Sequence, residues 1–452
     1  MKTNAEPRTQ NFWKAGILAV DSTKLVESQI DWTQNSLSLA GHPIPFADFE
    51  QLIITGAGKA SAGMAKGLIP VLKKISPDKK VTGWINVPDN CVEPHPFLTL
   101  HGGRPASLNE PTEKGRKGAK KILELVHSAT EKDLVICLIS GGGSALTPLP
   151  IDGVPLESKQ KMTRFLGQNG ATINQLNCVR SAISQIKAGG LVRGFQGHSF
   201  HSLIISDVPG NPLDVIASGM TVPNTVDCRK ALSILQLFDP ERKEVDSRIY
   251  DAIGKRDKTE TGKKEPIHTI FNHIIGDNTT AIQAMRRLSL ESGNETETHL
   301  ATTAENDVES VANAIWQKAL QRIGKGNFNQ PYYFISGGEP TVKLNDPHGK
   351  GGRNQHLALL ILEKIMRSEL CKRFEIEFTS VGTDGEDGPT NAAGASVNSA
   401  VIENAIQQSL DPLSYLSRHD SYHFFQKAGG LLVSGPTHTN VGDLRVLAIY
   451  DR

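Results

Sequence analysis

The sequence has little that would tie it to an oxidising compartment or a membrane. Its five cysteines show no CxxC spacing, which favours reduced thiols over a disulfide framework. No stretch approaches the roughly 18 apolar residues that a membrane span needs, and the N-terminus lacks the apolar core of a signal peptide. We therefore expect a cytoplasmic protein.

An excess of charge of one sign is also missing. Lysine plus arginine, 49, nearly equals aspartate plus glutamate, 48, so the net charge is +1 with histidine neutral. This balance gives no field for a nucleic-acid backbone, and 6% aromatic residues give no platform for stacking bases. The fourteen histidines include no HExxH motif and no zinc-like spacing. The expected partner is a small molecule, with no nucleic acid and no membrane.

What the chain does have is length and an α/β rhythm. Its 452 residues predict two or three domains at about 150 residues each. Short apolar runs alternate with helix-length amphipathic segments, which is typical of βαβ units. A densely charged stretch at 246–265 predicts a linker between an N-terminal domain over 1–245 and a C-terminal domain over 266–452.

Several apolar runs predict strands that end in polar or glycine-rich loops. These runs are 52–54, 134–139, 203–205, 269–275, 332–335, 376–381 and 431–433. In open α/β sheets, ligands bind at the carboxyl ends of the strands. The sequence therefore repeats polar loops where a site would form.

The loop after the first run reads GAGKAS and precedes a predicted helix at about 62–72. Glycines let backbone N–H groups approach an anion, and a helix N-terminus favours negative charge. We interpret Gly58, Lys59 and Ser61 as part of a phosphate or carboxylate cradle, while a tight turn with an exposed lysine stays open as the alternative. The loop is neither a Walker A motif nor a complete GxGxxG, because Ser61 stands at the third glycine position.

The loop after the second run contains three consecutive glycines between two serines. It comprises Ser140, Gly141, Gly142, Gly143 and Ser144. Such a run has a high conformational-entropy cost that a plain connection would not need, so we interpret it as a backbone nest for phosphate. A hydrolase nucleophile at Ser144 is disfavoured, because a GxSxG elbow would need glycine where leucine follows two positions later.

Polar residues after the next runs add candidates. Asp207 could orient or deprotonate a hydroxyl, hold a metal, or only cap a turn. Arg180 and Lys187 lie seven apart, which predicts one helical face that binds an anion or is merely solvated. We add Asn211 and Asn278 to the phosphate-binding or substrate-binding set. Asn278 or one of the two threonines after it is expected to cap the following helix.

The later loops predict a second anion site and a cation site. Gly352 and Arg353 introduce an apolar helix, where a guanidinium and the helix dipole suit a carboxylate or phosphate; a surface arginine at a cap is the alternative. Glu339, Asp384 and Asp387 offer hard oxygen ligands for Mg²⁺ if nucleotide phosphates complete the shell, although acidic glycine-rich turns are also common on surfaces.

Together these segments resemble the glycerate 2-kinase family, the class with a MOFRL-type C-terminal domain. The resemblance rests on GAGKASAGMAKG, SGGGSAL, the LN-VR block, SDVPGNPLDVIASG, GGEPTV, GKGGRNQ, GTDGEDGPTNAAGA and SGPTHTNVGDL, in this order over 56–444. It implies an α/β fold with a Rossmann-like N-terminal domain on a parallel sheet and a smaller α/β C-terminal domain. It also implies an active site in the cleft between these domains.

The activity that the resemblance implies is transfer of the γ-phosphoryl group of ATP to the 2-hydroxyl of D-glycerate, with Mg²⁺. The catalytic lysine, acid and arginine of the family match Lys59, Asp207 and Arg353. Lys59 and Arg353 would neutralise charge on the transferred group or the glycerate carboxylate, and Asp207 would position the hydroxyl. A homodimer is possible.

Some positions depart from the usual residues of the family and bear on the substrate. They are Arg104, Ser181, Ala182, Met220 and His356. A kinase of a related hydroxy acid therefore stays open, as does a non-catalytic binding protein. A third alternative is an NAD(P)H-dependent hydroxypyruvate reductase, for which Asp89 stands at a plausible distance for a ribose contact although no complete GxGxxG opens a helix.

Overall fold

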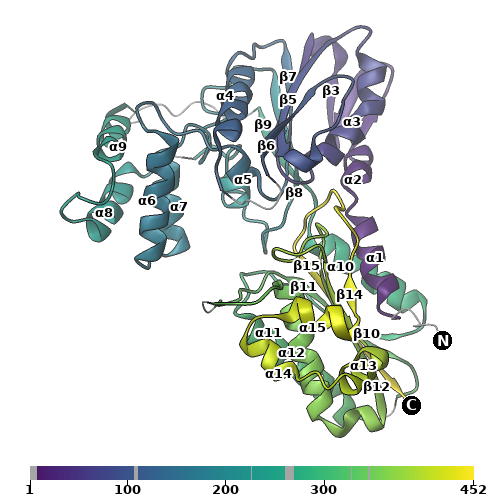
Figure 1. Cartoon of the computed structure of the whole chain (residues 1–452). Coiled ribbons are helices and arrows are strands. Elements are labelled where there is room, and N and C mark those ends of the chain that lie inside the picture. The colour runs from purple at the N-terminus through teal and green to yellow at the C-terminus, as the bar shows by residue number, and fades with distance from the viewer. Residues whose placement is uncertain (1–7, 106–109, 225, 260–268, 327, 345–346) are drawn as a thin grey trace. The chain divides into compact units, whose positions relative to one another are not determined.

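The computed structural model describes residues 8–105, 110–224, 226–259, 269–326, 328–344 and 347–452. It consists of two compact units (Figure 1). Unit 1 comprises residues up to Asp21, Ser206–Asn211 and Gly276–Arg452; unit 2 comprises Ser22–Ile205 and Pro212–Ile275. The chain thus passes from one unit to the other near residues 21, 205, 211 and 275 rather than once in a linker at 246–265.

Part of the predicted linker is a helix of unit 2. Ser247–Thr259 forms α9, in which Ile249 and Ile253 lie four residues apart and are fully buried. The high density of charge in this segment belongs to the solvent side of an amphipathic helix, because a narrow apolar stripe is enough to attach a helix to a core. Positions 260–265 of the predicted linker lie outside the described residues.

The described residues of unit 2 contain a six-stranded sheet in the order β6-β5-β4-β7-β8-β9. The strands are β4 (Gln51–Ala57), β5 (Lys80–Pro88), β6 (Thr99–Arg104), β7 (Asp133–Ile139), β8 (Ser199–Ile205) and β9 (Ile270–Gly276). The pairings of β6 with β5, β5 with β4, β4 with β7, and β7 with β8 are parallel. Numbered from β4, the order is 3-2-1-4-5-6, the order of Rossmann folds, and it confirms the Rossmann-like prediction. The order reverses between β4 and β7.

Helices and a small second sheet complete unit 2. They are α2 (Ser22–Ser28), β1 (Ile30–Trp32), β2 (Ser36–Leu39), β3 (His42–Pro45), α3 (Ser61–Ile75), α4 (Glu113–His127), α5 (Gly143–Leu146), α6 (Leu156–Gln168), α7 (Ile173–Ala182) and α8 (Cys228–Phe238). Helices α6 to α9 group together beside the sheet (Figure 1) and share a hydrophobic cluster of their own.

Unit 1 contains a mixed sheet in the order β10-β11-β15-β12-β13-β14 among its described residues. The strands are β10 (Glu295–His299), β11 (Tyr332–Gly338), β12 (Phe374–Gly382), β13 (Gly394–Val397), β14 (Leu431–Leu432) and β15 (Asp443–Asp451). The helices are α1 (Gln10–Ala19), α10 (Asn278–Glu291), α11 (Val308–Gly324), α12 (Arg353–Arg367), α13 (Ser399–Gln407), α14 (Pro412–Ser417) and α15 (Ser421–Ala428). This unit confirms the predicted second α/β domain.

The central strand β15 of unit 1 runs antiparallel to both of its neighbours, β11 and β12. Its first residue, Asp443, pairs with Gly338 at the end of β11 and with Gly382 at the end of β12. Three loops therefore meet at this edge of the sheet, since the carboxyl ends of two strands flank the beginning of the third.

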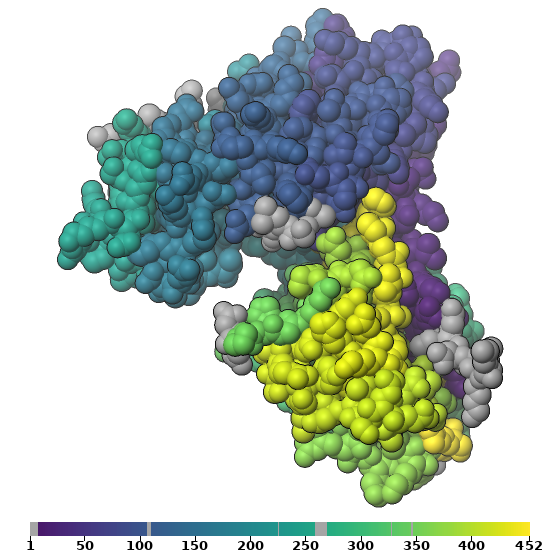
Figure 2. Space-filling view, in the orientation of Figure 1, coloured from purple at the N-terminus to yellow at the C-terminus, as the bar shows by residue number. Residues whose placement is uncertain are grey.

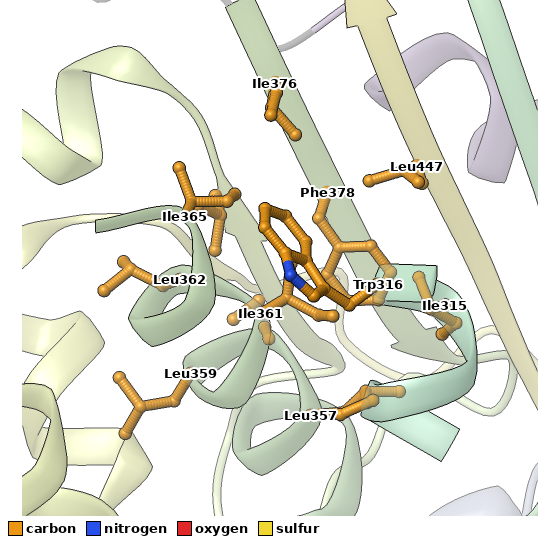
Figure 3. Close-up of a cluster of buried hydrophobic side chains, with 14 of the residues drawn as sticks. Ile315, Trp316, Leu357, Leu359, Ile361, Leu362, Ile365, Ile376, Phe378 and Leu447 are labelled. Atoms are coloured by element: carbon orange, nitrogen blue, oxygen red, sulfur yellow. The ribbon is translucent and has the colours of Figure 1, made fainter. Parts of the chain in front are cut away.

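The core of unit 1 lies between the sheet and helices α11 and α12. Figure 3 shows Trp316 of α11 and Ile361 of α12 beside Phe378 of β12 and Leu447 of β15. Helix α12 reads RNQHLALLILEKIMR, and it buries an almost continuous run of residues because it is covered on several sides.

The N-terminal helix α1 also belongs to unit 1. It contacts α10, and in Figure 2 the purple N-terminal segment lies against the green and yellow surface of this unit. Its Gly16 allows a close approach, because a Cβ there would lie 2.7 Å from Leu444. None of the helices in the described ranges is both long and apolar enough to cross a membrane.

Candidate functional site

In unit 2, the loops after β4 and β7 interlock at the point where the strand order reverses. The backbone N–H of Lys59 donates to the carbonyl oxygen of Gly141 over 2.9 Å, and the N–H of Ala60 donates to Ser140 Oγ over 2.9 Å. Gly58 has a φ of +155°, and a Cβ on it would lie 2.0 Å from Ser140 Oγ. The GAGKAS loop, predicted to bind an anion, therefore packs against the glycine-rich loop after β7.

These contacts explain the glycines and occupy the serine hydroxyls. Gly142 has a φ of +81°, and a Cβ on Gly143 would lie 2.8 Å from the carbonyl oxygen of Ala57. Ser61 Oγ donates to the carbonyl oxygen of Leu138 over 3.2 Å, and Ser61 is fully buried. Ser140 and Ser61, predicted to bind phosphate, thus hold the two loops together.

Two cationic side chains lie beside Gly142. A Cβ on Gly142 would lie 3.3 Å from Arg104 Nη2 and 3.6 Å from Lys59 Cγ. Arg104, which departs from the usual residue of the family, is buried at the end of β6. It brings a second positive charge to the loop that Lys59 also flanks.

At the far end of the same loop, Ser144 contacts two further cations. Arg180 Nη2 donates to Ser144 Oγ over 3.4 Å, and Lys187 Nζ donates to Ser144 Oγ and, over 2.9 Å, to Ser218 Oγ. The prediction that Arg180 and Lys187 share a helical face is wrong, because α7 ends at Ala182. The chain turns after α7 and brings Lys187 back to the same hydroxyl.

Burial changes the proton affinity of these cations. Lys187 is 1% exposed, and burial, together with the charges of Lys159 and Arg180, lowers the pKa of Lys187 well below its usual range. Burial also lowers the pKa of Arg180. Burying several positive charges away from water costs free energy of folding unless an anion binds beside them.

In unit 1, Arg353 at the start of α12 is held by two carboxylates. Its Nε donates to Asp443 Oδ2 over 2.8 Å, and its Nη2 donates to Asp443 Oδ1 over 2.9 Å and to Glu339 Oε1 over 2.8 Å. Asp443 is almost fully buried, whereas the Arg353 side chain is 34% exposed. Among the described residues, Nη1 of Arg353 has no hydrogen-bond acceptor, so its two N–H groups remain available to a ligand.

Asp207 lies in the same acidic neighbourhood. Its Oδ2 accepts a hydrogen bond from Asn440 Nδ2 over 3.1 Å. Burial raises the pKa of Glu339 to about 7, and the charges of Asp207 and Asp443 contribute in the same direction while Arg353 opposes them. The structure thus brings Asp207, Glu339 and Arg353 close together in unit 1.

The N-terminus of α12 is occupied by a side chain of the protein itself. Asp387 accepts hydrogen bonds from the backbone N–H of Asn354 over 3.0 Å and of Gln355 over 2.8 Å. A Cβ on Gly352 would lie 2.3 Å from Asp387, which explains the glycine. The predicted use of this helix terminus for a ligand anion therefore fails, since the buried carboxylate of Asp387 already neutralises it.

The predicted binding residues Asn211 and Asn278 also have structural partners. Asn211 Nδ2 donates to Asp277 Oδ2 over 2.7 Å. Asn278 Nδ2 donates to the carbonyl oxygens of Val441 and Asp443, each over 2.9 Å. The N-cap residue of α10 is Asp277, whose Oδ1 accepts from the N–H of Thr280, so none of positions 278–280 is the N-cap. Thr280 completes the capping box, because its Oγ1 accepts from the N–H of Asp277 over 3.4 Å.

The three carboxylates predicted to bind Mg²⁺ do not form one ligand group. Across the described part of the chain, no cluster of three or more His, Cys, Asp or Glu side chains could hold a metal ion. Asp387 uses both oxygens on α12, and Asp384 Oδ1 accepts from the N–H of Glu386 over 3.0 Å within a turn. Of the three, Glu339 is the one that contacts Arg353.

Other departures from the family lie in well-packed places. Ala182 and Met220 are buried in unit 2. His356 is buried in the first turn of α12 and stacks on His419 with ring centroids 5.2 Å apart, and burial lowers the pKa of His356 to about 4. Ser181, in the last turn of α7, accepts a hydrogen bond from Arg256 Nη1 over 3.2 Å at its carbonyl oxygen.

Sequence reasoning missed three residues of these clusters. Asp443 and Asn440 lie within the motif SGPTHTNVGDL but were assigned no role. Lys159 occupies a position of the apolar stripe of α6, between Leu156 and Met162, and this lysine within an apolar stripe was the available signal.

Comparison with known proteins gives matches over both units. A family described as "Domain of unknown function (DUF4147)" matches residues 8–253, and one described as the MOFRL family matches residues 332–443. A glycerate kinase of Rattus norvegicus is 34% identical over 455 residues, covering 89% of this chain and 85% of the relative. A D-glycerate 2-kinase of Thermotoga maritima is 34% identical over 407 residues, covering 89% of this chain and 91% of the relative.

A solved structure agrees with these matches. The crystal structure of a glycerate kinase of Thermotoga maritima superposes with a TM-score of 0.79 at 32% identity. The match covers 97% of this chain and 98% of the other.

Proposed function

We propose, from the premise that the chain belongs to the glycerate 2-kinase family, that it transfers the γ-phosphoryl group of ATP to the 2-hydroxyl of D-glycerate. The observation that carries the proposal is that relatives named glycerate kinase match over nearly the whole chain, and that Arg353, Asp207 and Glu339 gather at one edge of the unit 1 sheet. Phosphoryl transfer depends mainly on positioning and on electrostatic stabilisation.

Arg353 is oriented to bind the transferred phosphoryl group. The bidentate contact with Asp443 fixes the guanidinium, so its Nη1 donors can bind the phosphoryl group without further ordering of the side chain. Because these donors are in place before substrate binds, little reorganisation is needed when negative charge develops in the transition state.

Asp207 is assigned to the acceptor hydroxyl. Asn440 Nδ2 donates a hydrogen bond to its Oδ2, and we assign this carboxylate to accept the hydrogen bond of the 2-hydroxyl. As the hydroxyl oxygen bonds to the γ-phosphorus and the bond from that phosphorus to the β,γ-bridging oxygen breaks, the hydroxyl proton passes to Asp207 and ADP leaves.

Unit 2 supplies positive charge for the phosphates. Lys59 and Arg104 flank the loop of Gly141, Gly142 and Gly143, which lies where the strand order of the sheet reverses. In sheets of this kind the ligand lies at that point, and we assign the nucleotide phosphates to this loop.

Glu339 is the carboxylate best suited to the Mg²⁺ that accompanies ATP. In proteins this cation takes one or two carboxylates, several waters and phosphate oxygens, so a full protein cage is not required. Burial, with the charges of Asp207 and Asp443, raises the pKa of Glu339 to about 7, and a nearby cation would stabilise its charged form. When bound, Mg²⁺ neutralises charge on the phosphates.

The test is a phosphorus-31 NMR spectrum of the purified protein with ATP, Mg²⁺ and D-glycerate. We expect a new phosphomonoester resonance at the position of 2-phosphoglycerate. A resonance of 3-phosphoglycerate would overturn the regiochemistry, and unchanged ATP would overturn the kinase assignment for glycerate. A parallel trace of NADH with hydroxypyruvate tests the reductase, for which we expect no oxidation.

A further inference from the structure

We propose that a pocket in unit 2, lined by Lys159, Arg180 and Ser144, binds a compact oxyanion, either the carboxylate of the hydroxy acid or a phosphate of the nucleotide. The pocket has a volume of about 390 Å³ and is also lined by Gly142 and Arg164. This inference rests on the proposed function, because it assigns one anionic group of the two substrates to a place.

The buried side chain of Lys159 is the main support for this site. Lys159 is 2% exposed, and within the described chain its Nζ has no hydrogen-bond acceptor. Leaving a buried ammonium without an acceptor is among the most costly arrangements in a folded protein. Lys159 is also among the residues that line the pocket.

The residues around Lys159 also favour an anion. Arg180 of α7 and Lys187, from the turn after α7, add positive charge, and each donates to Ser144 Oγ. Arg164, one turn further along α6, and Glu110, before α4, also line or border the space, and Glu110 is exposed. Among the described residues, no carboxylate forms an ion pair with Lys159, Arg180 or Lys187.

The lowered pKa of Lys159 is also what a pocket that binds an anion predicts. Burial lowers the pKa of Lys159 to about 7, and the charge of Arg180 contributes. An oxyanion in the pocket would raise this pKa again, because an opposite charge favours the charged form. Binding is therefore coupled to proton uptake near pH 8, whereas a lysine that only fills space would show no such coupling.

The ligand is identified by direct titration of three probes: D-glycerate, ATP and inorganic phosphate. Each is titrated separately by calorimetry at pH 8, in Tris and in HEPES, into wild type and K159M. We expect at least one probe to bind K159M about tenfold more weakly, and the binding enthalpy of that probe to depend on the buffer for wild type alone. If only D-glycerate binds K159M more weakly, the pocket binds the carboxylate of the hydroxy acid. If ATP or inorganic phosphate binds K159M more weakly, the pocket binds a phosphate.

A matched control is available on the same helix. K161M makes the same substitution at a side chain that is 67% exposed and paired with Glu157, and it should bind all probes as wild type does. Methionine fits the buried position and removes an uncompensated charge, so K159M is expected to fold; circular dichroism and its melting temperature check this.

Equal affinities of wild type and K159M for all three probes, with no buffer dependence, would overturn the pocket. This outcome differs from failure of the kinase assignment. A protein that binds D-glycerate through Lys159 but forms no phosphoglycerate would uphold the pocket and refute the kinase. If the protein forms 2-phosphoglycerate and K159M has unchanged KM values, the kinase assignment would be upheld and the pocket refuted.

Discussion

The cationic side chains of the candidate sites in the two units differ in whether carboxylates neutralise them. In unit 1, Arg353 is surrounded by acids and bound bidentately by Asp443, so its charge is compensated before any ligand arrives. In unit 2, Lys159 and Lys187 are buried with other cations, and none of their described neighbours compensates them with a carboxylate.

This difference separates two kinds of function. A compensated arginine keeps one geometry and stabilises charge that appears only during the reaction, which affects kcat. Uncompensated cations gain most from an anion already present in the ground state, which affects affinity and KM. The comparison predicts that substitutions in unit 1 change chiefly kcat and that substitutions around Ser144 change chiefly binding.

The largest expected effect is that of R353K. Lysine cannot reproduce the contacts with Asp443 and Glu339 while also reaching the phosphoryl group, so kcat should decrease on the order of 10³-fold. Steady-state kinetics with D-glycerate and ATP measures this. R367K, on the same helix with a side chain that is 75% exposed, is the control and should retain the wild-type kcat. A kcat of R353K within a few-fold of wild type would refute the assigned role.

The next effect, for K59M, tests whether unit 2 takes part in catalysis at all. Loss of the Lys59 charge should lower kcat/KM for ATP on the order of 10²-fold, since the nucleotide phosphates lose a charge-assisted contact. K66M, on α3 with a side chain that is 45% exposed, is the matched control. If K59M lowered only the melting temperature, Lys59 would hold the loops together rather than bind phosphate.

The Rossmann-like half of the molecule was the easier part to predict from the sequence. Parallel strands buried on both faces appear as continuous apolar runs, and β7 buries all seven of its residues. Strand β15 of unit 1 was missed because Asp443 and Arg445 stand near its start, although both are buried. Arg445 forms an ion pair with Glu305, a partner 140 residues away that no local pattern indicates.

The candidate site was predictable in its residue types and not in its pairings. Lys59, Asp207 and Arg353 follow from motifs, and their partners in the fold depend on how the loops meet. Asp387 illustrates the limit, because an acidic residue in a glycine-rich turn is equally suited to a metal or to a helix N-terminus. The structure places it on the N–H groups of Asn354 and Gln355.

A smaller effect is expected for N440A, which removes the hydrogen bond to Asp207 Oδ2. The carboxylate would keep its charge and lose its orientation, so kcat should decrease about tenfold while KM for ATP stays unchanged. N404A removes a side-chain amide that donates to the carbonyl oxygen of Ala428 in the same unit, and it controls for lost stability. Equal kcat values for N440A and N404A would mean that Asp207 needs no positioning by Asn440.

The smallest expected effect is a change in stability on substitution of Lys159. It measures how much a buried cation without a carboxylate partner destabilises the fold. An ordinary lysine stays protonated up to a pKa of about 10.5, whereas burial lowers the pKa of Lys159 in the folded protein to about 7. Between these values the unfolded chain binds one proton more, so the contribution of this group to stability rises with pH. Its destabilising effect is therefore complete below pH 7 and disappears above pH 10.5.

K159M should accordingly melt at a higher temperature than wild type at pH 6, by about 2–5 °C, and the difference should shrink towards pH 10. Thermal unfolding followed by circular dichroism, without substrate or phosphate in the buffer, measures the difference at each pH. K161M should show no difference at any pH, since its lysine is exposed. A lower melting temperature for K159M at pH 6 would mean that Lys159 stabilises the fold, and the contrast between the two units would then vanish. A gain that shrinks with pH, together with weaker anion binding, would mean that unit 2 gives up stability to keep a cation for its ligand.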